Sequence, residues 1–377
     1  MAYLSPQLPS PLTAPAWFGA STDQPLNLAA RIHAQLQDKK HRERWKYTRV
    51  QPILDLLNQP VADSDELDLP AEIIQSSLRR DQAPAEIPVF FADGLMSTLD
   101  AAPEAMAHLC YNSSIRVLDV KGESSQPLRL EAGHLTQPLI IRLGEGAKLE
   151  LHESYPSGDA AQLQTLWIDM QRGSQLIHAR NNFSDSTHWQ FLRVRIGQDA
   201  TYRLHTHAQG ATLRRQDMQV ICAGQGAHAE VTSAAFVSNK LHLDQQITIE
   251  HQAPHTTSQQ RFHNIADGGA KITFNGRIHI HRQCPGVDAN LSNKNLSIGK
   301  GATINTKPEL EIYTDDVKCS HGSTIGSIDP DHLFYFASRG IPAQQAQSLL
   351  MKAFLGTCIT GPLAAAASEQ MQFHTAG

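Results

Sequence analysis

The sequence predicts a mainly β fold, a parallel β-helix with helical segments at both ends of the chain. Short runs of alternating apolar and polar residues fill residues 116–310, as expected for half-buried strands. A similar turn recurs among these runs at a nearly fixed interval. We therefore expect an N-terminal helical or irregular domain over residues 1–110, a β-helix core over 111–326 and a C-terminal helical domain over 327–377.

The recurring turn places glycine or a polar residue before a small residue, and a strand follows. The aligned small residues are Ala147, Ser174, Ala200, Ala227, Ala270 and Ala302. Their successive intervals along the chain are 27, 26, 27, 43 and 32. A fixed interval in the twenties suits β-helix coils stacked about 4.8 Å apart, whereas a propeller blade needs about 40–50 residues. The two longer intervals predict an inserted loop or an extra partial coil.

The composition is that of a soluble globular protein, with 41% hydrophobic residues and a net charge of −5. No basic run indicates binding to nucleic acid or to an anionic membrane. Residues 1–18 lack the basic and apolar regions of a secretory signal, and the apolar run at 353–367 is too short to span a bilayer. Five scattered cysteines without a CxxC fit a reducing compartment, so we expect a cytoplasmic protein.

The N-terminal third gives weaker signals. Residues 21–36 predict a capped amphipathic helix, and residues 50–57 predict more helix or a short strand leading into one. Residues 58–86 are polar and punctuated by proline, which predicts a linker or an irregular surface segment. The first strand is expected at 87–94, and a short helix at 103–109.

Residues 309–326, ELEIYTDDVKCSHGSTIG, concentrate side chains that bind metals and sulfur. The segment starts as a strand, so Cys319 and His321 should share one face about 6.5–7 Å apart. Thiolate and imidazole suit iron, zinc and iron–sulfur clusters, and Lys318 could favour the thiolate. Two side chains cannot complete a site, so other ligands must come from a partner chain, distant residues or solvent. The alternative is a buried structural cysteine beside a hydrogen-bonded histidine.

Two more histidine pairs have the same spacing, His205 with His207 and His279 with His281. Each pair could bind a metal ion from one strand face. No carboxylate or cysteine obviously completes either pair, so we expect solvated or hydrogen-bonded histidines.

The C-terminal segment predicts two helices. Asp329 and Pro330 are typical of a helix start, and Gly340 of its end. Pro342 opens a second helix that ends near Gly356. The apolar stripes on this pair either pack on the β-helix or form a docking surface.

Residues 292–354 resemble the SufB/SufD family of the SUF iron–sulfur assembly machinery. The run ATINTKPELEIYTDDVKCSHGSTIG, followed by DHLFYFASRGI, is similar to the C-terminal signature of the SufD branch. Residues 293–310 also match, and ERWKYT at 43–48 is similar to an N-terminal segment of the family. The KCSHG form resembles SufD rather than its paralogue SufB.

The resemblance implies a right-handed parallel β-helix in a cytosolic complex with a SufB-like subunit and a SufC-like ABC ATPase. A transient Fe–S cluster would be shared with the SufB-like subunit, and the isolated chain would bind none stably. Cys319 and His321 would lie at that interface, where the histidine is implicated in cluster assembly. The chain has no GxxxxGK[ST] motif, so we expect a non-catalytic scaffold rather than an ATPase. The isolated chain could also form a homodimer.

The resemblance further implies that the C-terminal helices dock the ATPase. The apolar residues expected there are Leu333, Phe334, Phe336, Leu349, Leu350 and Phe354. One departure from the family is the Gly361-Pro362 break, because family members usually continue this helix.

Two alternatives belong to other functional classes. A β-helix polysaccharide lyase or hydrolase could use Asp315, Asp316 and Lys318. Such enzymes are usually secreted and need an aromatic groove, but aromatic residues make up only 6% of this chain. The second alternative is a homo-oligomeric structural β-helix without chemistry.

Overall fold

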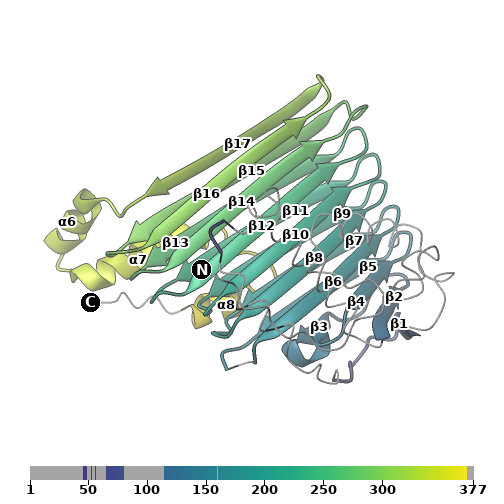
Figure 1. Cartoon of the computed structure of the whole chain (residues 1–377), viewed down its shortest axis with the longest axis horizontal. Helices are drawn as coiled ribbons and strands as arrows, with labels where there is room; N and C mark the ends of the chain where they lie inside the picture. The colour runs from purple at the N-terminus through teal and green to yellow at the C-terminus, as the bar shows by residue number, and fades with distance from the viewer. Residues whose placement is uncertain are drawn as a thin grey trace, which may run out of the picture.

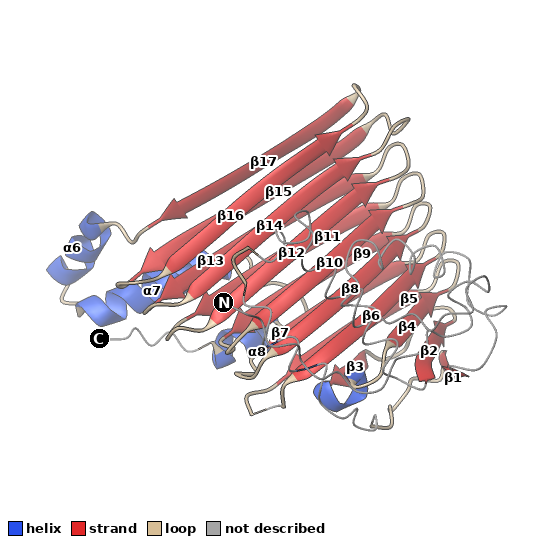
Figure 2. Ribbon diagram, viewed as in Figure 1, coloured by secondary structure: helices blue, strands red, loops and turns tan. Residues whose placement is uncertain are grey.

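The computed structural model describes residues 46–48, 52, 56, 65–79, 114–158 and 160–371. These residues form two stacked sheets, drawn as red arrows in Figure 2. In order across it, the nine-stranded sheet contains β1 (Ile73–Arg79), β2 (Ser114–Val120), β4 (Leu139–Leu143), β6 (Gln162–Met170), β8 (His188–Ile196), β10 (Arg214–Cys222), β12 (His242–His251), β14 (Lys271–Ile280) and β16 (Thr303–Ile312). The eight-stranded sheet contains β3 (Leu128–Glu131), β5 (Lys148–Tyr155), β7 (Gln175–Asn182), β9 (Thr201–Gln209), β11 (His228–Val237), β13 (Thr257–Asp267), β15 (Val287–Ile298) and β17 (Val317–Gly326).

From β2 onward, successive strands alternate between the two sheets, so each coil contributes one strand to each sheet. From β2 onward, all neighbours in a sheet are parallel. The coils stack in sequence order, with β17 at one end and β1 at the other (Figure 1). The predicted parallel β-helix is therefore confirmed.

The recurring turns explain the repeat that the sequence shows. In the turn before β11, the Ala227 amide donates to the Gly224 carbonyl oxygen at 3.1 Å, and Gly226 has φ +72°. Glycine adopts this left-handed conformation without steric cost. Asp199 occupies the equivalent place before β9 with φ 54°, which aspartate tolerates better than most residues. Ala227 is fully buried at the corner of the coil.

The irregular intervals between these turns also have a structural reason. The first four turns precede β5, β7, β9 and β11, whereas the last two precede β14 and β16 in the other sheet. The longest interval therefore spans one and a half coils, so the expected extra partial coil is correct and an inserted loop is not. Later coils also contain more residues. More residues separate Lys271 from its partner Thr303 on the next coil than separate Lys148 from its partner Gln175.

The interior is held by ladders of inward-facing residues in register. One aliphatic ladder consists of residues that pair with each other on successive coils: Leu118, Ile141, Ile168, Val194, Val220, Ile249, Ile278 and Leu310. All of these except Leu310 are fully buried. Each such side chain contributes roughly 1.5–3 kcal/mol of hydrophobic stabilisation. Leu310 is only partly covered because its strand, β16, ends the described sheet.

A polar ladder runs beside the aliphatic one. Gln164, Gln190, Gln216 and Gln245 occupy one inward column, and each of the last three amides donates to the glutamine on the preceding coil, at 2.9, 3.2 and 3.3 Å. Repetition of the coil places identical side chains above one another, so their hydrogen-bonding groups satisfy each other.

Strand β1 corrects the prediction of an irregular segment over residues 58–86. It pairs antiparallel with β2, with Ile73 opposite Val120, and so covers the first edge of the parallel sheet. Ile73 joins the core. Local composition conceals the strand because its pairing partner, β2, is distant in the sequence. The elements expected over 21–36, 87–94 and 103–109 lie outside the described residues.

Three C-terminal helices follow the last coil, α6 (Pro330–Ser338), α7 (Ala343–Gly356) and α8 (Ala364–Gln370). A short 3₁₀ helix, Ala132–Leu135, follows β3. None of the helices in the described part of the chain has the length and apolarity that a bilayer span requires. Of the predicted helix over 50–57, only Pro52 and Leu56 are described, and both are helical.

Candidate functional site at the open end of the β-helix

Among the described residues, no strand covers the interior of the β-helix beyond its last coil, and this end is called the open end. Strand β17 pairs only with β15 among the described strands, and β16 pairs only with β14. Strand β17 is largely exposed and β16 is mostly half-buried, whereas the strands of the preceding coils are mostly buried. Figure 1 shows β17 alone at this end of the stack. The strand predicted at the start of the segment 309–326 is thus the end of β16 in the nine-stranded sheet, and the rest of the segment bends into β17, the edge of the described eight-stranded sheet.

Cys319 lies at the open end of the β-helix interior. It lies opposite Ala289 of β15, which is buried in the core, and its own side chain packs against that core. Cys319 is therefore half-buried and inward-facing. This position combines the two interpretations of the sequence, because the thiol packs on the core and is also reachable from the open end.

His321 points to the same inward face of β17 as Cys319 but is exposed. It lies opposite Leu291, a fully buried residue of β15. On an inner coil this position would be enclosed, so His321 is exposed only because no described coil follows. No third His, Cys, Asp or Glu of the described chain gathers with Cys319 and His321 into a metal-sized cluster. The role of Cys319 and His321 as metal or cluster ligands stays a prediction.

The electrostatics of the thiol differ from the expectation. Burial, and next the Asp288 carboxylate, raise the pKa of the Cys319 thiol above its ordinary value. The predicted activation by Lys318 is wrong because successive side chains of a strand point to opposite faces, so the ammonium lies away from the thiol. Cys319 is a neutral thiol in this chain, and a bound metal ion would be needed to deprotonate it.

Polar groups close the gap between the two sheets behind these residues. The Thr306 and Ser323 hydroxyls are 2.8 Å apart, which joins β16 to β17 directly. One of these hydroxyls donates to the other, and both oxygens lie near the Asn293 side-chain oxygen, at 3.2 and 3.4 Å, so the remaining hydroxyl proton can be donated there. Nearby apolar side chains stay exposed, with Tyr313 at 55% and Ile325 at 52%. The end is therefore a mixed polar and apolar surface.

Helices α6 and α7 begin and end where the sequence predicts, whereas α8 was not predicted. The Asp329 side chain accepts a hydrogen bond from the Asp331 amide at 2.9 Å and caps α6, with Pro330 in the first turn. Gly340, at φ +78°, follows the end of that helix, and α7 runs from Ala343 to Gly356. The break at Gly361 is also present, with φ +83°.

Of the residues expected to dock a partner, some are packed against the β-helix and others are exposed. Helix α7 packs on the eight-stranded sheet through Met351 and Leu355, which belong to a cluster with residues of β11 and β13. Phe354 stacks on the His263 ring at 4.7 Å, so it contributes to this packing. No residue of α6 is buried, and Phe334 is 76% exposed. Leu349 of α7 is exposed too, whereas Leu333, Phe336 and Leu350 are half-buried.

The two histidine pairs have different environments. His207 is buried and its Nδ1 lies 2.8 Å from the Asn181 side-chain oxygen, while His205 Nδ1 lies 2.9 Å from the Thr232 hydroxyl. These are hydrogen-bonded histidines, as expected. His279 and His281, by contrast, have a carboxylate beside them that sequence reasoning missed, because Glu250 comes from the preceding coil. Burial, and then His281, lower the pKa of His279, so its imidazole is neutral at pH 7.

A buried ionic network was also missed. Inside the coils of β5 and β7, Arg180 donates two hydrogen bonds to Glu153, at 2.9 and 2.8 Å, and Tyr155 and His178 bond the same carboxylate. Burial alone would raise the pKa of Glu153, but Arg180 and His178 outweigh it and hold the pKa well below its ordinary value. Glu153 lies in phase with inward-facing Leu151, a signal that could have placed it inside.

Comparisons with known proteins support the resemblance seen in the sequence. The sequence model described as SUF system FeS cluster assembly, SufBD core domain, matches residues 129–354. Iron-sulfur cluster assembly protein SufD of Escherichia coli is 32% identical over 219 residues, 57% of this chain and 52% of that protein. An iron-sulfur cluster assembly SufBD family protein of Synechocystis is 31% identical over 236 residues, 59% of this chain and 52% of that protein.

A plant relative, Protein ABCI7, chloroplastic, of Arabidopsis thaliana, is 28% identical over 224 residues, 57% of this chain and 47% of that protein. The chain thus spans about half the length of these relatives in the matched region. The core-domain match runs from β3 through the open end into α7, which is more than half of the chain. The chain belongs to the SufBD family of the SUF iron–sulfur cluster assembly system.

Proposed function

We propose that this chain is a non-catalytic scaffold subunit of a SUF assembly complex. Its open end pairs with a SufB-like second β-helix, and its C-terminal helices dock a SufC-like ABC ATPase. The nascent Fe–S cluster is the cargo built between the two β-helices. The isolated chain holds no cluster stably, because Cys319 and His321 supply only part of a ligand set.

The position of Cys319 and His321 carries this proposal. Both lie on the inward column of β17, at an end that no described coil covers. A second β-helix seated on this end would exclude water from both side chains and add its own ligands. The raised pKa of the thiol fits a ligand that is engaged only when metal arrives.

The free edges of β16 and β17 support pairing with another chain. Their unpaired backbone groups are a template for strand addition. Exposed Tyr313 and Ile325 add apolar area at the two strands, which a partner can bury. A β-helix from a related subunit has the strand spacing needed to continue both sheets.

Docking of the ATPase rests on α6 and the exposed part of α7. Phe334 has little contact with the rest of the described chain, and Leu349 lies on the neighbouring helix. Phe354 is withdrawn from this surface by His263, so the docking surface is centred on α6.

The alternatives gain less support. Asp315 and Asp316 lie in the exposed bend between β16 and β17, and family membership favours assembly over polysaccharide cleavage. A homodimer would use the same open end, with one copy replacing the SufB-like subunit. That competition makes the homodimer an outcome of the experiment below.

Co-expression of the full chain with the SufB-like and SufC-like subunits of its own genome tests the proposal. Affinity capture of the tagged chain should recover both partners in a defined stoichiometry. Capture of neither partner by a normally folded chain, or of a second copy alone, would overturn it.

Substitution of His321 tests the site itself. His321→Ala should leave folding intact, because the side chain is exposed, yet abolish cluster maturation in cells that depend on this system. Lys318→Ala on the opposite face of β17 is the matched control and should mature clusters normally. Cys319→Ser should give a milder loss. Normal cluster-enzyme activity in the His321 variant would remove His321 from the mechanism.

A further inference from the structure

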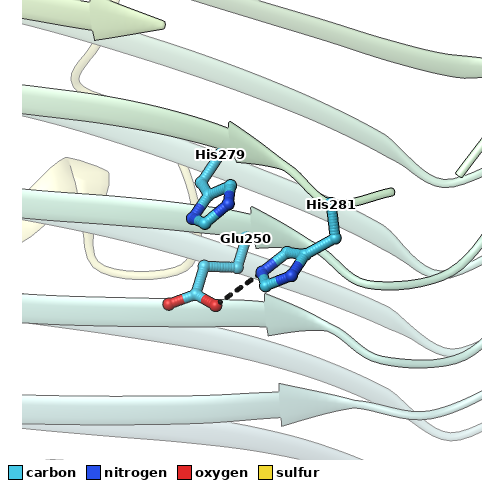
Figure 3. Close-up of side chains that lie close together, drawn as sticks. All are labelled: Glu250, His279 and His281. Atoms are coloured by element: carbon cyan, nitrogen blue, oxygen red, sulfur yellow. Dashed lines mark hydrogen bonds and ion pairs between the residues drawn. The ribbon is translucent and has the colours of Figure 1, made fainter. Parts of the chain in front are cut away.

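Three ligand-type side chains gather on the outer face of the nine-stranded sheet. His279 is on β14, His281 directly follows that strand, and Glu250 is on β12 (Figure 3). One nitrogen from each histidine and one carboxylate oxygen all lie within 4.8 Å of one another. Within the described residues, this is the only such group of three. Ile278 and Ile280 are fully buried, so His279 and His281, which alternate with them, point outward.

The register of the coils creates this arrangement. Glu250 pairs with His279, and His279 pairs with Glu311 on the next coil. The three side chains form one outward column, with about 4.8 Å between strands. The Glu311 carboxylate lies 3.6 Å from His279 Nδ1. His281 Nε2 lies 3.2 Å from Glu250, which links the end of β14 to the same carboxylate.

The carboxylate is held in place by its own neighbours. The Gln219 side-chain amide donates to one oxygen of Glu250 at 2.6 Å, and Gln252 donates to the other at 3.1 Å. Such outer contacts fix the orientation of a metal ligand. The His279 and His281 rings are stacked, with centroids 4.1 Å apart, and Tyr313 covers His279 at 5.5 Å.

This column differs from its own earlier coils. Lower in the column, acids pair with arginines: Arg142 with Asp119 at 2.5 Å and Arg195 with Asp169 at 3.3 Å. At Glu250 the column places an imidazole where those coils place a guanidinium. An imidazole can donate a lone pair to a metal ion, whereas a guanidinium cannot.

We propose that Glu250, His279 and His281 bind one divalent transition metal ion of the Zn²⁺ or Fe²⁺ type, with Glu311 as a further carboxylate. Two imidazoles and a carboxylate are a ligand set that both ions use, with positions left for water. Ligand atoms of a tetrahedral zinc ion lie about 3.3 Å apart, so the two imidazoles turn toward each other as the ion enters. The side chain of His281 is 38% exposed, which leaves a path from solvent.

This inference is independent of the proposed scaffold function. The three ligands face outward from the nine-stranded sheet, whereas Cys319 faces the interior from the other sheet. Substitutions at the two places can therefore be read separately.

Titration of the metal-free full-length chain with Co²⁺ tests the site, because cobalt replaces zinc and iron and reports its ligands in the visible spectrum. We expect one site whose spectrum lacks a thiolate-to-cobalt charge-transfer band and is unchanged in Cys319→Ser. Zn²⁺ should displace the cobalt and raise the melting temperature of the protein. A spectrum with the thiolate band, or no binding, would overturn the assignment.

The variants sharpen this test. His279→Ala combined with His281→Ala should weaken Co²⁺ binding by at least about tenfold and remove the zinc-induced rise in melting temperature. Glu250→Gln keeps the shape of the side chain and should also weaken binding, which covers the case in which the double variant folds poorly. His332→Ala, at an exposed histidine of α6, is the matched control and should bind as the parent does. Unchanged Co²⁺ affinity in both site variants would show that these side chains form only ion pairs between neighbouring coils.

Discussion

Replacing Glu153 by glutamine should strongly destabilise the β-helix. The carboxylate accepts two hydrogen bonds from Arg180 and is also bonded by Tyr155 and His178, all inside the coils. Glutamine keeps the shape but removes the charge, so Arg180 stays buried without its anion. Breaking a buried ion pair on one side costs about 3–5 kcal/mol of unfolding free energy. We expect a loss of that size for Glu153→Gln.

Urea unfolding measures this loss through the midpoint and the slope. The matched control is Glu150→Gln on the same strand, where the carboxylate lies 2.6 Å from His152 but is half-exposed. That change should cost less than about 1 kcal/mol, as surface ion pairs do. A loss below about 1 kcal/mol for Glu153→Gln, with an unchanged slope, would refute the reasoning.

A double substitution separates charge burial from packing. Glu153→Leu with Arg180→Met removes both members of the pair and fills their space with apolar atoms. Apolar replacement of a whole buried pair is often neutral or stabilising. The double variant should therefore be more stable than Glu153→Gln alone. The pair also makes stability depend on pH: the folded-state pKa of Glu153 is lowered, so its contribution is present above the ordinary glutamate pKa and is lost on acidification.

Three further predictions concern other parts of the chain. Burial lowers the pKa of His251 to about 4, so the unfolded state binds the extra proton below about pH 6.5, and the unfolding free energy should fall by up to about 3 kcal/mol as the pH drops to 4; His251→Asn should flatten this profile in urea titrations at several pH values. Gly226→Ala should cost about 1–3 kcal/mol, because φ is +72° and a Cβ would meet the Asp199 carboxylate at 2.3 Å, whereas Gly322→Ala has open space and should be nearly neutral by thermal melting. Phe334→Asp should leave the unfolding free energy within about 0.5 kcal/mol and yet abolish capture of the ATPase; retained capture would move the docking surface elsewhere.

The fold could be predicted because its determinants are local and repeated. A similar turn recurs through most of the coils, with a left-handed residue before a small corner residue, as at Gly226 and Ala227. The turn residues and the alternation of the strands therefore specify the coil one repeat at a time. The starts of α6 at Pro330 and α7 at Ala343 were equally visible, since capping depends on adjacent residues.

The features that sequence reasoning missed depend on pairing between coils. Strand β1 is stabilised by β2, and Glu250 reaches His279 only through the register of β12 with β14. The sequence alone does not show that Glu250 and His279 are neighbours, because that requires the number of residues in the coil between β12 and β14. The position of Cys319 was predicted, but the direction of its pKa shift was not, because burial depends on how the coil ends.

The residue at position 321 fits the proposal that a partner which is not purely apolar covers the open end. Its column reads Leu204, Val231, Gln260 and Leu291 on the preceding coils, all fully buried. If the end simply met solvent, a charged or small residue would serve; if an apolar cap covered it, a buried imidazole would need a hydrogen-bond partner. A histidine here, with Cys319 two residues before it, is suited to an interface that brings polar or metal partners of its own. The partial ligand set and the strand edges that no described strand pairs are therefore both consistent with the proposed site shared between two chains.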